Sequence, residues 1–252
     1  MRDDDLLPAD LWDADAARAY DTPGTGRFAP EVLGPAVDRL VELADGGPAL
    51  ELAVGTGRVA LPLVRRGVPV TGIELSPAMV EVLRTKVGAA ALPVVLGDMA
   101  TARAPGRFAL VYLVDNTISN LLTQDAQVAC FRNAARHLGP GGRFVVELWV
   151  PTLRTLPPGR DADVWGHEPG YLGVDTYDVV AQRIVSHHVR FGGGVEARVF
   201  RTPHRYVWPS ELDLMGRLAG FEIESRHADW AGTPFTAESR SHVSVYRLPP
   251  RP

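Results

Sequence analysis

The sequence predicts an α/β protein in which a largely parallel sheet carries helices on both faces, with an antiparallel β insertion after the fifth strand. Two observations support this fold class. Between residues 48 and 150, short apolar runs alternate with segments of helical periodicity. From residue 151 this pattern gives way to strands in which polar and apolar residues alternate, and the α/β pattern returns at residue 209.

Helical spacing ahead of the first apolar run predicts two N-terminal helices. They cover residues 8–21 and 30–44, and the turn-forming segment TPGTGR at 22–27 separates them.

Five apolar runs are expected to form the first strands, and helical segments connect them. The strands are expected at 48–54, 68–75, 92–98, 107–114 and 143–150. The helices are expected at 58–67, 76–87 and 123–138, and the segment GPGG at 139–142 is expected to form a turn. Ser76 is expected to cap its helix, with Pro77 at the first helical position. In such sheets, ligands bind at the carboxyl ends of the strands.

The chain after residue 150 reads as an insertion followed by the end of the sheet. Residues 151–170 are rich in proline and glycine and are expected to form a connection, with three antiparallel strands following between 171 and 208. A helix capped by Ser210 is expected at 209–220. Two closing strands, at 221–230 and 241–248, bring the expected sheet to seven strands.

Composition excludes several functional classes. The net charge of -4 and pI of about 6.0 argue against a nucleic-acid partner, because proteins that bind nucleic acids normally have a basic surface. The acidic N-terminus lacks a signal-peptide pattern, and no apolar run approaches the roughly 20 residues that span a bilayer. We therefore expect a cytoplasmic protein with no membrane partner. The single cysteine, Cys130, excludes an intramolecular disulfide and a cysteine-based zinc site, and no metal is expected.

Acidic residues lie at the carboxyl ends of three successive predicted strands. The turn after the first strand reads Glu51-Leu-Ala-Val-Gly-Thr-Gly-Arg58, and its glycines let the backbone approach a ligand closely. Glu74 ends the second strand, where a carboxylate can accept hydrogen bonds from both hydroxyls of a ribose. Asp98 and Met99 end the third, and they suit the amino group and ring of an adenine. Each acid alone is an ordinary strand-end residue, but their joint order indicates a nucleoside site.

These stretches resemble the class I (Rossmann-like) S-adenosylmethionine (SAM)-dependent methyltransferases of the small-molecule, secondary-metabolite type. The resemblance rests on LELAVGTGR, VTGIELSPAM, VVLGDM and LGPGGRFVVEL, covers residues 49–150, and extends to the closing strand pair. It implies a seven-stranded sheet, SAM as cofactor, and methyl transfer to a small molecule. The implied units are an N-terminal lid (1–45), a SAM-binding core (46–150), a substrate-cover insertion (151–208) and the closing helix and strands (209–252).

The resemblance also implies which residues contact the cofactor. Those at the glycine turn would line the methionine moiety, Glu74 would bind the ribose, Asp98 would hold the adenine edge, and Tyr20 would close over the cofactor as a lid. The full implied set is Tyr20, Glu51, Ala53, Gly55, Gly57, Arg58, Glu74, Leu75, Met79, Asp98, Met99, Val114, Asp115 and Asn116.

The glycine turn departs from the commonest form of the family motif. Ala53 replaces the first glycine and Arg58 the third. The turn also fits G-x-G-x-x-A, so a nicotinamide-dependent oxidoreductase is an alternative. Glu51 argues against this alternative. A dinucleotide site normally has small apolar residues at this position, whereas a ligand that carries an ammonium group favours an acidic residue there. A non-methylating SAM-binding protein is a further alternative that the sequence leaves open.

Methyl transfer is an in-line displacement that depends mainly on positioning and exclusion of water, so no catalytic base can be assigned. The acceptor atom is expected to be nitrogen or oxygen, with carbon not excluded. The expected acceptor-side residues are Trp12, Tyr20, Asn116, Ser119, Asn120, Trp149, His167, Tyr177, His188 and Tyr206. His187 and His188 are adjacent in a predicted strand, so they should face opposite sides of it. An alternative role for the insertion is a homodimer surface, because an exposed strand edge can pair with the same edge of a second copy.

Overall fold

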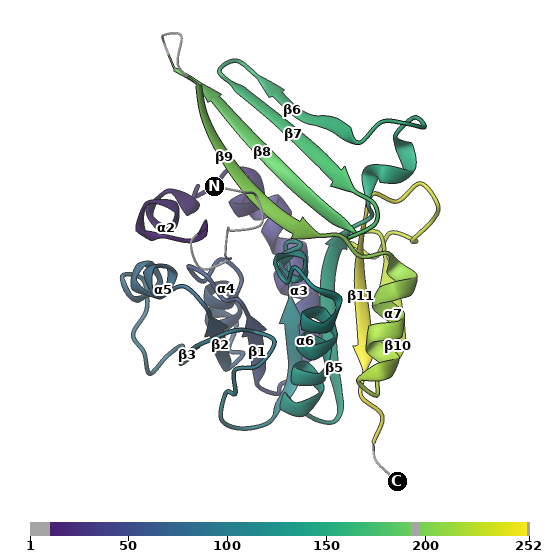
Figure 1. The fold of residues 1–252 in the computed structure, drawn as a ribbon. Coiled ribbons are helices and arrows are strands. Elements are labelled where there is room, and N and C mark those ends of the chain that lie inside the picture. Colours follow the sequence, from purple (N-terminus) through teal and green to yellow (C-terminus); the bar gives the residue numbers. More distant parts are fainter. Residues whose placement is uncertain (1–10, 193–196, 251–252) are drawn as a thin grey trace.

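The computed structural model describes residues 11–192 and 197–250 of the chain, and its centre is a seven-stranded sheet (Figure 1). The strands of this sheet are β1 (Ala49–Leu52), β2 (Val70–Glu74), β3 (Val94–Leu96), β4 (Phe108–Leu113), β5 (Leu138–Trp149), β10 (Glu222–His227) and β11 (Ser241–Arg247). Their order is β10-β11-β5-β4-β1-β2-β3. Strands β1 to β5 pair in parallel, whereas β11 pairs antiparallel with both β5 and β10. The predicted α/β fold is confirmed.

Helices cover both faces of this sheet, and each face has its own apolar core. The helical segments are α2 (Ala14–Tyr20), η2 (Gly26–Phe28), α3 (Pro30–Ala44), α4 (Ala60–Arg65), α5 (Pro77–Arg84), η3 (Thr117–Asn120), α6 (Gln124–His137), η4 (Thr152–Thr155) and α7 (Pro209–Leu218). Leu40 of α3 and Leu63 of α4 are fully buried on one face, and Phe131 of α6 and Met215 of α7 are buried on the other. Among the described helices, none is both long and apolar enough to cross a bilayer.

The helix ends test the predicted caps. The Ser76 hydroxyl accepts the Met79 N–H at 3.2 Å, and Pro77 opens α5, so this cap is confirmed. The predicted cap at Ser210 is wrong. Helix α7 begins at Pro209 and its cap is Trp208, which makes no side-chain capping bond, because proline at the first position already fits the helix and lacks an N–H to satisfy. The predicted helix at 8–21 is shorter in the structure, and its residues 8–10 lie outside the described residues.

The predicted turn at 139–142 is wrong, because this segment belongs to β5. Gly141 N–H donates to the carbonyl of Leu248, and Leu248 N–H donates to the carbonyl of Gly142. The pairing of β4 with β5 accommodates this segment through a register shift between Phe108 and Leu110 of β4. The closing strand therefore supplies hydrogen-bond partners that a local turn pattern does not reveal.

The insertion after β5 folds as a second, antiparallel sheet. Its strands are β6 (Ala162–Glu168), β7 (Tyr171–Asp178), β8 (Arg183–Phe191) and β9 (Ala197–Arg205), in that order. The expectation of a plain connection at 151–170 is therefore wrong in part, because it contains η4 and β6. Strand β6 is an edge strand with a register shift between Val164 and Gly166, which explains its weak sequence pattern. Figure 1 shows this second sheet lying across one end of the core, above α2.

Candidate cofactor and acceptor site

The turn that follows β1 depends on left-handed backbone conformations. Ala53, Gly55 and Gly57 have φ values of 57°, 54° and 85°. A Cβ on Gly57 would lie 2.5 Å from Cδ1 of Leu83, so α5 packs directly on the turn and leaves no room for a side chain there. Gly55 has open space around it, and glycine is favoured there by conformation alone. Ala53 keeps the turn geometry at the cost of a strained backbone.

The carboxylate of Glu74 is held in place by backbone donors from two loops. Its Oε2 accepts the Gly55 N–H at 2.7 Å and its Oε1 accepts the Ser76 N–H at 2.9 Å. The residue is only 5% exposed, and burial raises the pKa of its carboxyl while the N–H donors act in the opposite direction. A carboxylate has about four acceptor positions, so two remain for a ligand.

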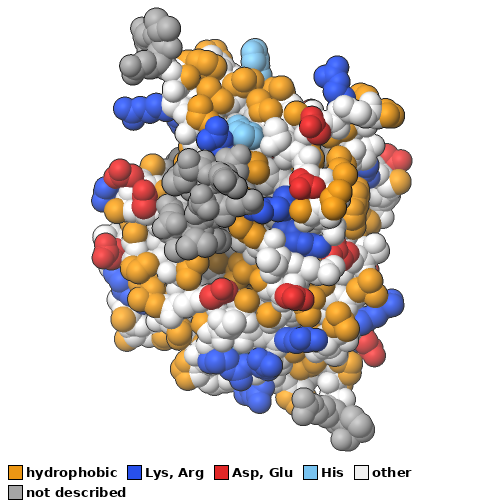
Figure 2. Space-filling model, in the orientation of Figure 1, with side chains coloured by type: hydrophobic (Ala, Val, Ile, Leu, Met, Phe, Trp, Pro, Cys, Tyr) orange, Lys and Arg blue, Asp and Glu red, His pale blue; other side chains and the backbone are white. Residues whose placement is uncertain are grey.

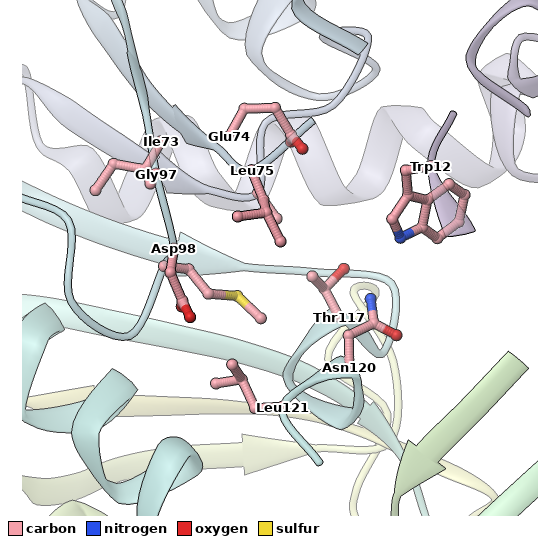
Figure 3. A pocket seen from close by; sticks show the side chains of 11 residues that line it. Trp12, Ile73, Glu74, Leu75, Gly97, Asp98, Thr117, Asn120 and Leu121 are labelled. Atoms are coloured by element: carbon pink, nitrogen blue, oxygen red, sulfur yellow. The ribbon is translucent and has the colours of Figure 1, made fainter. Parts of the chain in front are cut away.

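Glu74 lies at the edge of a small cavity at the carboxyl ends of β1, β2 and β3 (Figure 3). Its wall is mostly apolar, and the close-up shows Glu74 and Asp98 on separate loops with Leu75 between them and Trp12 across the opening. The lining residues are Trp12, Ala53, Ile73, Glu74, Leu75, Gly97, Asp98, Met99, Thr117, Asn120 and Leu121. A mostly apolar slot with fixed carboxylates at its rim suits a nucleoside.

The three strand-end acids predicted together do not share this cavity. Glu74 and Asp98 line it, but Glu51 does not. Glu51 is buried within β1, where its Oε2 accepts the hydroxyl of Tyr112 on β4 at 2.9 Å. Burial raises the pKa of Glu51 to about 8, while the Tyr112 hydroxyl and the charge of Arg58 act to lower it. Sequence reasoning missed Tyr112, which lies opposite Glu51 in the parallel register.

The loop after β4 is fastened to β5 by an acid that sequence reasoning also missed. Asp115 N–H donates to Oε2 of Glu147 at 2.8 Å, and the indole N–H of Trp230 donates to Oε1 at 2.7 Å. Asn116 Oδ1 accepts the Trp149 N–H at 2.7 Å. Asp115 and Asn116 both have left-handed φ values, of 57° and 61°. An isolated acid inside an apolar strand is the signal that could have singled out Glu147, as it singled out Glu51.

Helix α2 is tied to the glycine turn and to α5. The Thr56 hydroxyl donates to Asp21 at 2.6 Å, and Lys86 forms an ion pair with Asp21 while donating to the carbonyl of Thr56 at 2.8 Å. The Ser76 hydroxyl donates to the carbonyl of Trp12 at 2.6 Å. Sequence reasoning found none of these ties, because they join segments that are tens of residues apart.

Tyr20 lies at the end of α2 among other rings. It meets Trp12 and Phe28 edge-on, at centroid separations of 5.7 and 6.0 Å, and the Arg27 guanidinium stacks on it at 5.4 Å. Arg27 also pairs with Asp115. The predicted lid residue is therefore joined through Arg27 to the loop after β4.

The predicted acceptor-side residues are divided among three places. Trp12 and Asn120 line the cavity, and Ser119 is fully buried in η3. Tyr177 and Tyr206 belong to a small apolar cluster beneath the second sheet. His167 is exposed on the edge strand β6, apart from the rest. In the part of the chain that the structure describes, no three histidine, cysteine or acidic side chains are arranged to hold a metal ion.

The remaining predicted cofactor residues lie around the cavity rather than in its wall. Met79 is buried in α5 and Val114 is buried after β4. The Arg58 side chain is 12% exposed and lies 3.6 Å from the Asp115 carboxylate. The Arg58–Asp115 ion pair joins the glycine turn to the loop after β4.

Comparison with known proteins agrees with this geometry. Residues 49–142 match a family model described as a methyltransferase domain. The CcbJ methyltransferase from Streptomyces caelestis is 36% identical, with a TM-score of 0.82, and the match covers 97% of this chain and 98% of that one. Cypemycin N-terminal methyltransferase from a Streptomyces species is 28% identical over 80% of this chain and 83% of that protein.

A structure with bound SAM shares the fold. CalS10, an amino pentose methyltransferase from Micromonospora echinaspora, is 21% identical with a TM-score of 0.66, over 93% of this chain and 95% of that one. The predicted cofactor and enzyme class are therefore confirmed. The chain belongs to the SAM-dependent methyltransferases.

Proposed function

We propose that this methyltransferase transfers the methyl group of SAM to a nitrogen of a small natural-product acceptor. The observation that carries the proposal is the Glu74 carboxylate, fixed by the Gly55 and Ser76 N–H groups at the rim of an apolar cavity. The second sheet lies over the same end of the core (Figure 1). A site covered by such a sheet suits a small molecule.

The residues present fit the cofactor. The two acceptor positions left on Glu74 match the two hydroxyls of a ribose, and Asp98 with Leu75 and Met99 would hold the adenine. When bound, SAM supplies an electrophilic methyl group on a positively charged sulfur. The protein binds and orients both reactants and keeps water out, which is where most of the rate of such a displacement can originate.

Nitrogen is favoured over oxygen by the relatives. Cypemycin N-terminal methyltransferase is named for an amino terminus, and CalS10 for an amino pentose. The net charge of -4 also favours a small or cationic acceptor over a nucleic acid. We propose in addition that residues 1–45, 46–150, 151–208 and 209–252 act as lid, cofactor core, acceptor cover and closing unit. The homodimer through the insertion stays a prediction.

The test is a methyl-transfer assay with SAM and three acceptor classes: amino sugars, peptides with a free amino terminus, and phenols. Formation of S-adenosylhomocysteine together with an N-methylated product, found by mass spectrometry, is the expected result. If only the phenols gave a methylated product, the acceptor atom would be oxygen and the proposal of nitrogen would be wrong. SAM binding without product from any class would favour the non-methylating alternative, and binding of a nicotinamide nucleotide in place of SAM would refute the proposal.

A further inference from the structure

Four side chains on one face of the second sheet form a continuous row of hydrogen bonds. The hydroxyl of Tyr171 lies 2.8 Å from Nδ1 of His188, whose Nε2 lies 3.4 Å from the hydroxyl of Thr202. The same hydroxyl lies 3.2 Å from Nε2 of His204. The row thus runs through β7, β8 and β9, and each of its inner members has contacts on two sides.

The strand register places these residues on a common face. His204 pairs with Ile184, Thr202 with Ser186, and His188 with Phe200, so alternate residues of β8 and β9 share the row. His187 lies on the opposite face, where it contacts Thr176 at 3.1 Å and Arg201 at 3.2 Å. The prediction that the two adjacent histidines face opposite sides is borne out by these contacts.

His188 is fixed within this row by its neighbours. Gly173, its partner on β7, has no side chain, and the Trp165 ring fills that space, because a Cβ on Gly173 would meet this ring at 2.6 Å. The rings of Trp165 and His188 meet edge-on with centroids 5.4 Å apart, and Phe200 lies 5.8 Å away on the other side. This packing holds the imidazole in one orientation.

The inner end of the row reaches the acceptor side of the site. The His204 ring meets Trp149 edge-on at 5.8 Å, and Asn116 holds the Trp149 N–H next to the loop after β4. The Gln127 amide donates to the carbonyls of Ile118 and Arg205, which fastens the end of β9 to η3 in the cavity wall. His204 therefore lies one aromatic ring away from the loop that borders the site.

One nitrogen at this inner end has no partner. Nδ1 of His204 is buried and makes no hydrogen bond to any residue that the structure describes. Burial lowers the pKa of His204 to about 4, so the ring is neutral near pH 7 and one of its nitrogens carries a lone pair. A buried ring nitrogen without a partner is costly unless it serves a ligand or a bound water.

The outer end of the row meets the surface. Tyr171 begins β7 and is partly exposed, with the Arg190 guanidinium 5.8 Å above its ring. In Figure 2, histidine and hydrophobic side chains reach the surface at the upper end of the molecule, which Figure 1 shows to be the second sheet. The row therefore connects a buried nitrogen beside the site to the solvent.

We propose that the row Tyr171–His188–Thr202–His204 carries the proton of the acceptor nitrogen out to solvent. The inference rests on the proposed function, because an amine that is methylated has a proton to lose. Nδ1 of His204 accepts that proton, and its Nε2 proton passes to the Thr202 hydroxyl. The Thr202 proton passes to Nε2 of His188, the Nδ1 proton of His188 passes to the Tyr171 oxygen, and the Tyr171 proton passes to water. One proton enters and one leaves, and every contact in the row is kept with its donor and acceptor exchanged.

The first test needs no acceptor. Side-chain ¹⁵N NMR of histidine-labelled protein reports which ring nitrogen carries the proton. In Thr202→Val, which removes the hydroxyl and keeps the shape, the signals of His188 and His204 should both change, while Thr202→Ser should restore them. His187 should be unaffected in either variant. Unchanged His188 and His204 signals in Thr202→Val would overturn the relay.

The second test uses the amine that the wild type methylates best. Proton transfer by a positioned side chain contributes roughly 10²–10⁴-fold, so Thr202→Val and His204→Asn should lower kcat by at least about tenfold. The KM for SAM should stay constant, Thr202→Ser should recover most of the rate, and the control His187→Asn should be as active as the wild type. A Thr202→Val variant that keeps the wild-type kcat would overturn the relay and leave the proposed function standing. A wild type that binds SAM but methylates no amine would overturn the proposed function and the relay with it.

Discussion

Replacement of Glu74 by glutamine should weaken SAM binding and also destabilise the fold. Both carboxylate oxygens already accept a backbone N–H, from Gly55 at 2.7 Å and from Ser76 at 2.9 Å. A glutamine retains one oxygen and presents an NH₂ group in place of the other. That NH₂ group then faces one of the two N–H donors, so one backbone donor loses its acceptor.

The size of each effect follows from these contacts. A hydrogen bond to a charged group is worth about 1.5–3 kcal/mol, so loss of one ribose contact should raise the Kd for SAM by roughly tenfold to a hundredfold. A buried donor left without a partner costs about 1–3 kcal/mol, and the free energy of unfolding should fall by about that amount. The two effects are separable, since the second is present without ligand.

Isothermal titration calorimetry with SAM measures the first effect and chemical denaturation measures the second. Glu224→Gln is a matched control, because Glu224 forms an exposed ion pair with Arg143 at 3.0 Å, on strand β10 at the edge of the sheet. The control should bind SAM like the wild type. A Glu74→Gln variant that binds SAM as tightly as the wild type would refute the assignment of Glu74 to the ribose.

Three further changes test other parts of the site. Gly57→Ala should destabilise the fold by about 2–5 kcal/mol in thermal or chemical unfolding, because it combines a left-handed φ of 85° with a Cβ 2.5 Å from Leu83. The pKa of Glu51 is about 8 in the folded protein against an ordinary value of 4.5, so the folded state binds the extra proton and wild-type stability should fall as pH rises between these values. Glu51→Gln should abolish that slope in urea titrations at several pH values; an equally steep slope would contradict the assignment. Lys86→Met, which removes the ion pair to Asp21, should speed SAM release up to about fivefold in stopped-flow experiments, since a partly exposed pair is worth about 0.2–1 kcal/mol.

The meeting of Glu74 and Asp98 at one cavity could be predicted from sequence. Glu74 ends β2 and Asp98 follows the end of β3, and parallel strands place their carboxyl ends at one edge of the sheet. Local order along the chain was therefore enough to bring both acids to one cavity. Glu51 lies in the same motif, but its carboxylate accepts the Tyr112 hydroxyl and it is not among the residues that line the cavity.

The acceptor side could not be predicted in the same way. Its histidines were candidates only as residue types, and each has an ordinary structural interpretation. The register of β8 and β9 is what places His188, Thr202 and His204 in one row, and a shift of one residue would have sent each to the other face. Burial, which leaves Nδ1 of His204 without a partner among the described residues, is likewise a property of the assembled fold.

The sequence by itself determined the fold class, the glycine turn and the acids that follow the strands, because hydrophobic periodicity and backbone conformation are local properties of the chain. The tertiary structure alone decided which side chains meet across strands and which polar atoms are left unpaired. Glu147 holds the loop after β4, and contacts among Asp21, Thr56 and Lys86 hold the end of α2, in each case between distant segments. Such contacts depend on strand register and on burial, and both arise only when distant segments pack together.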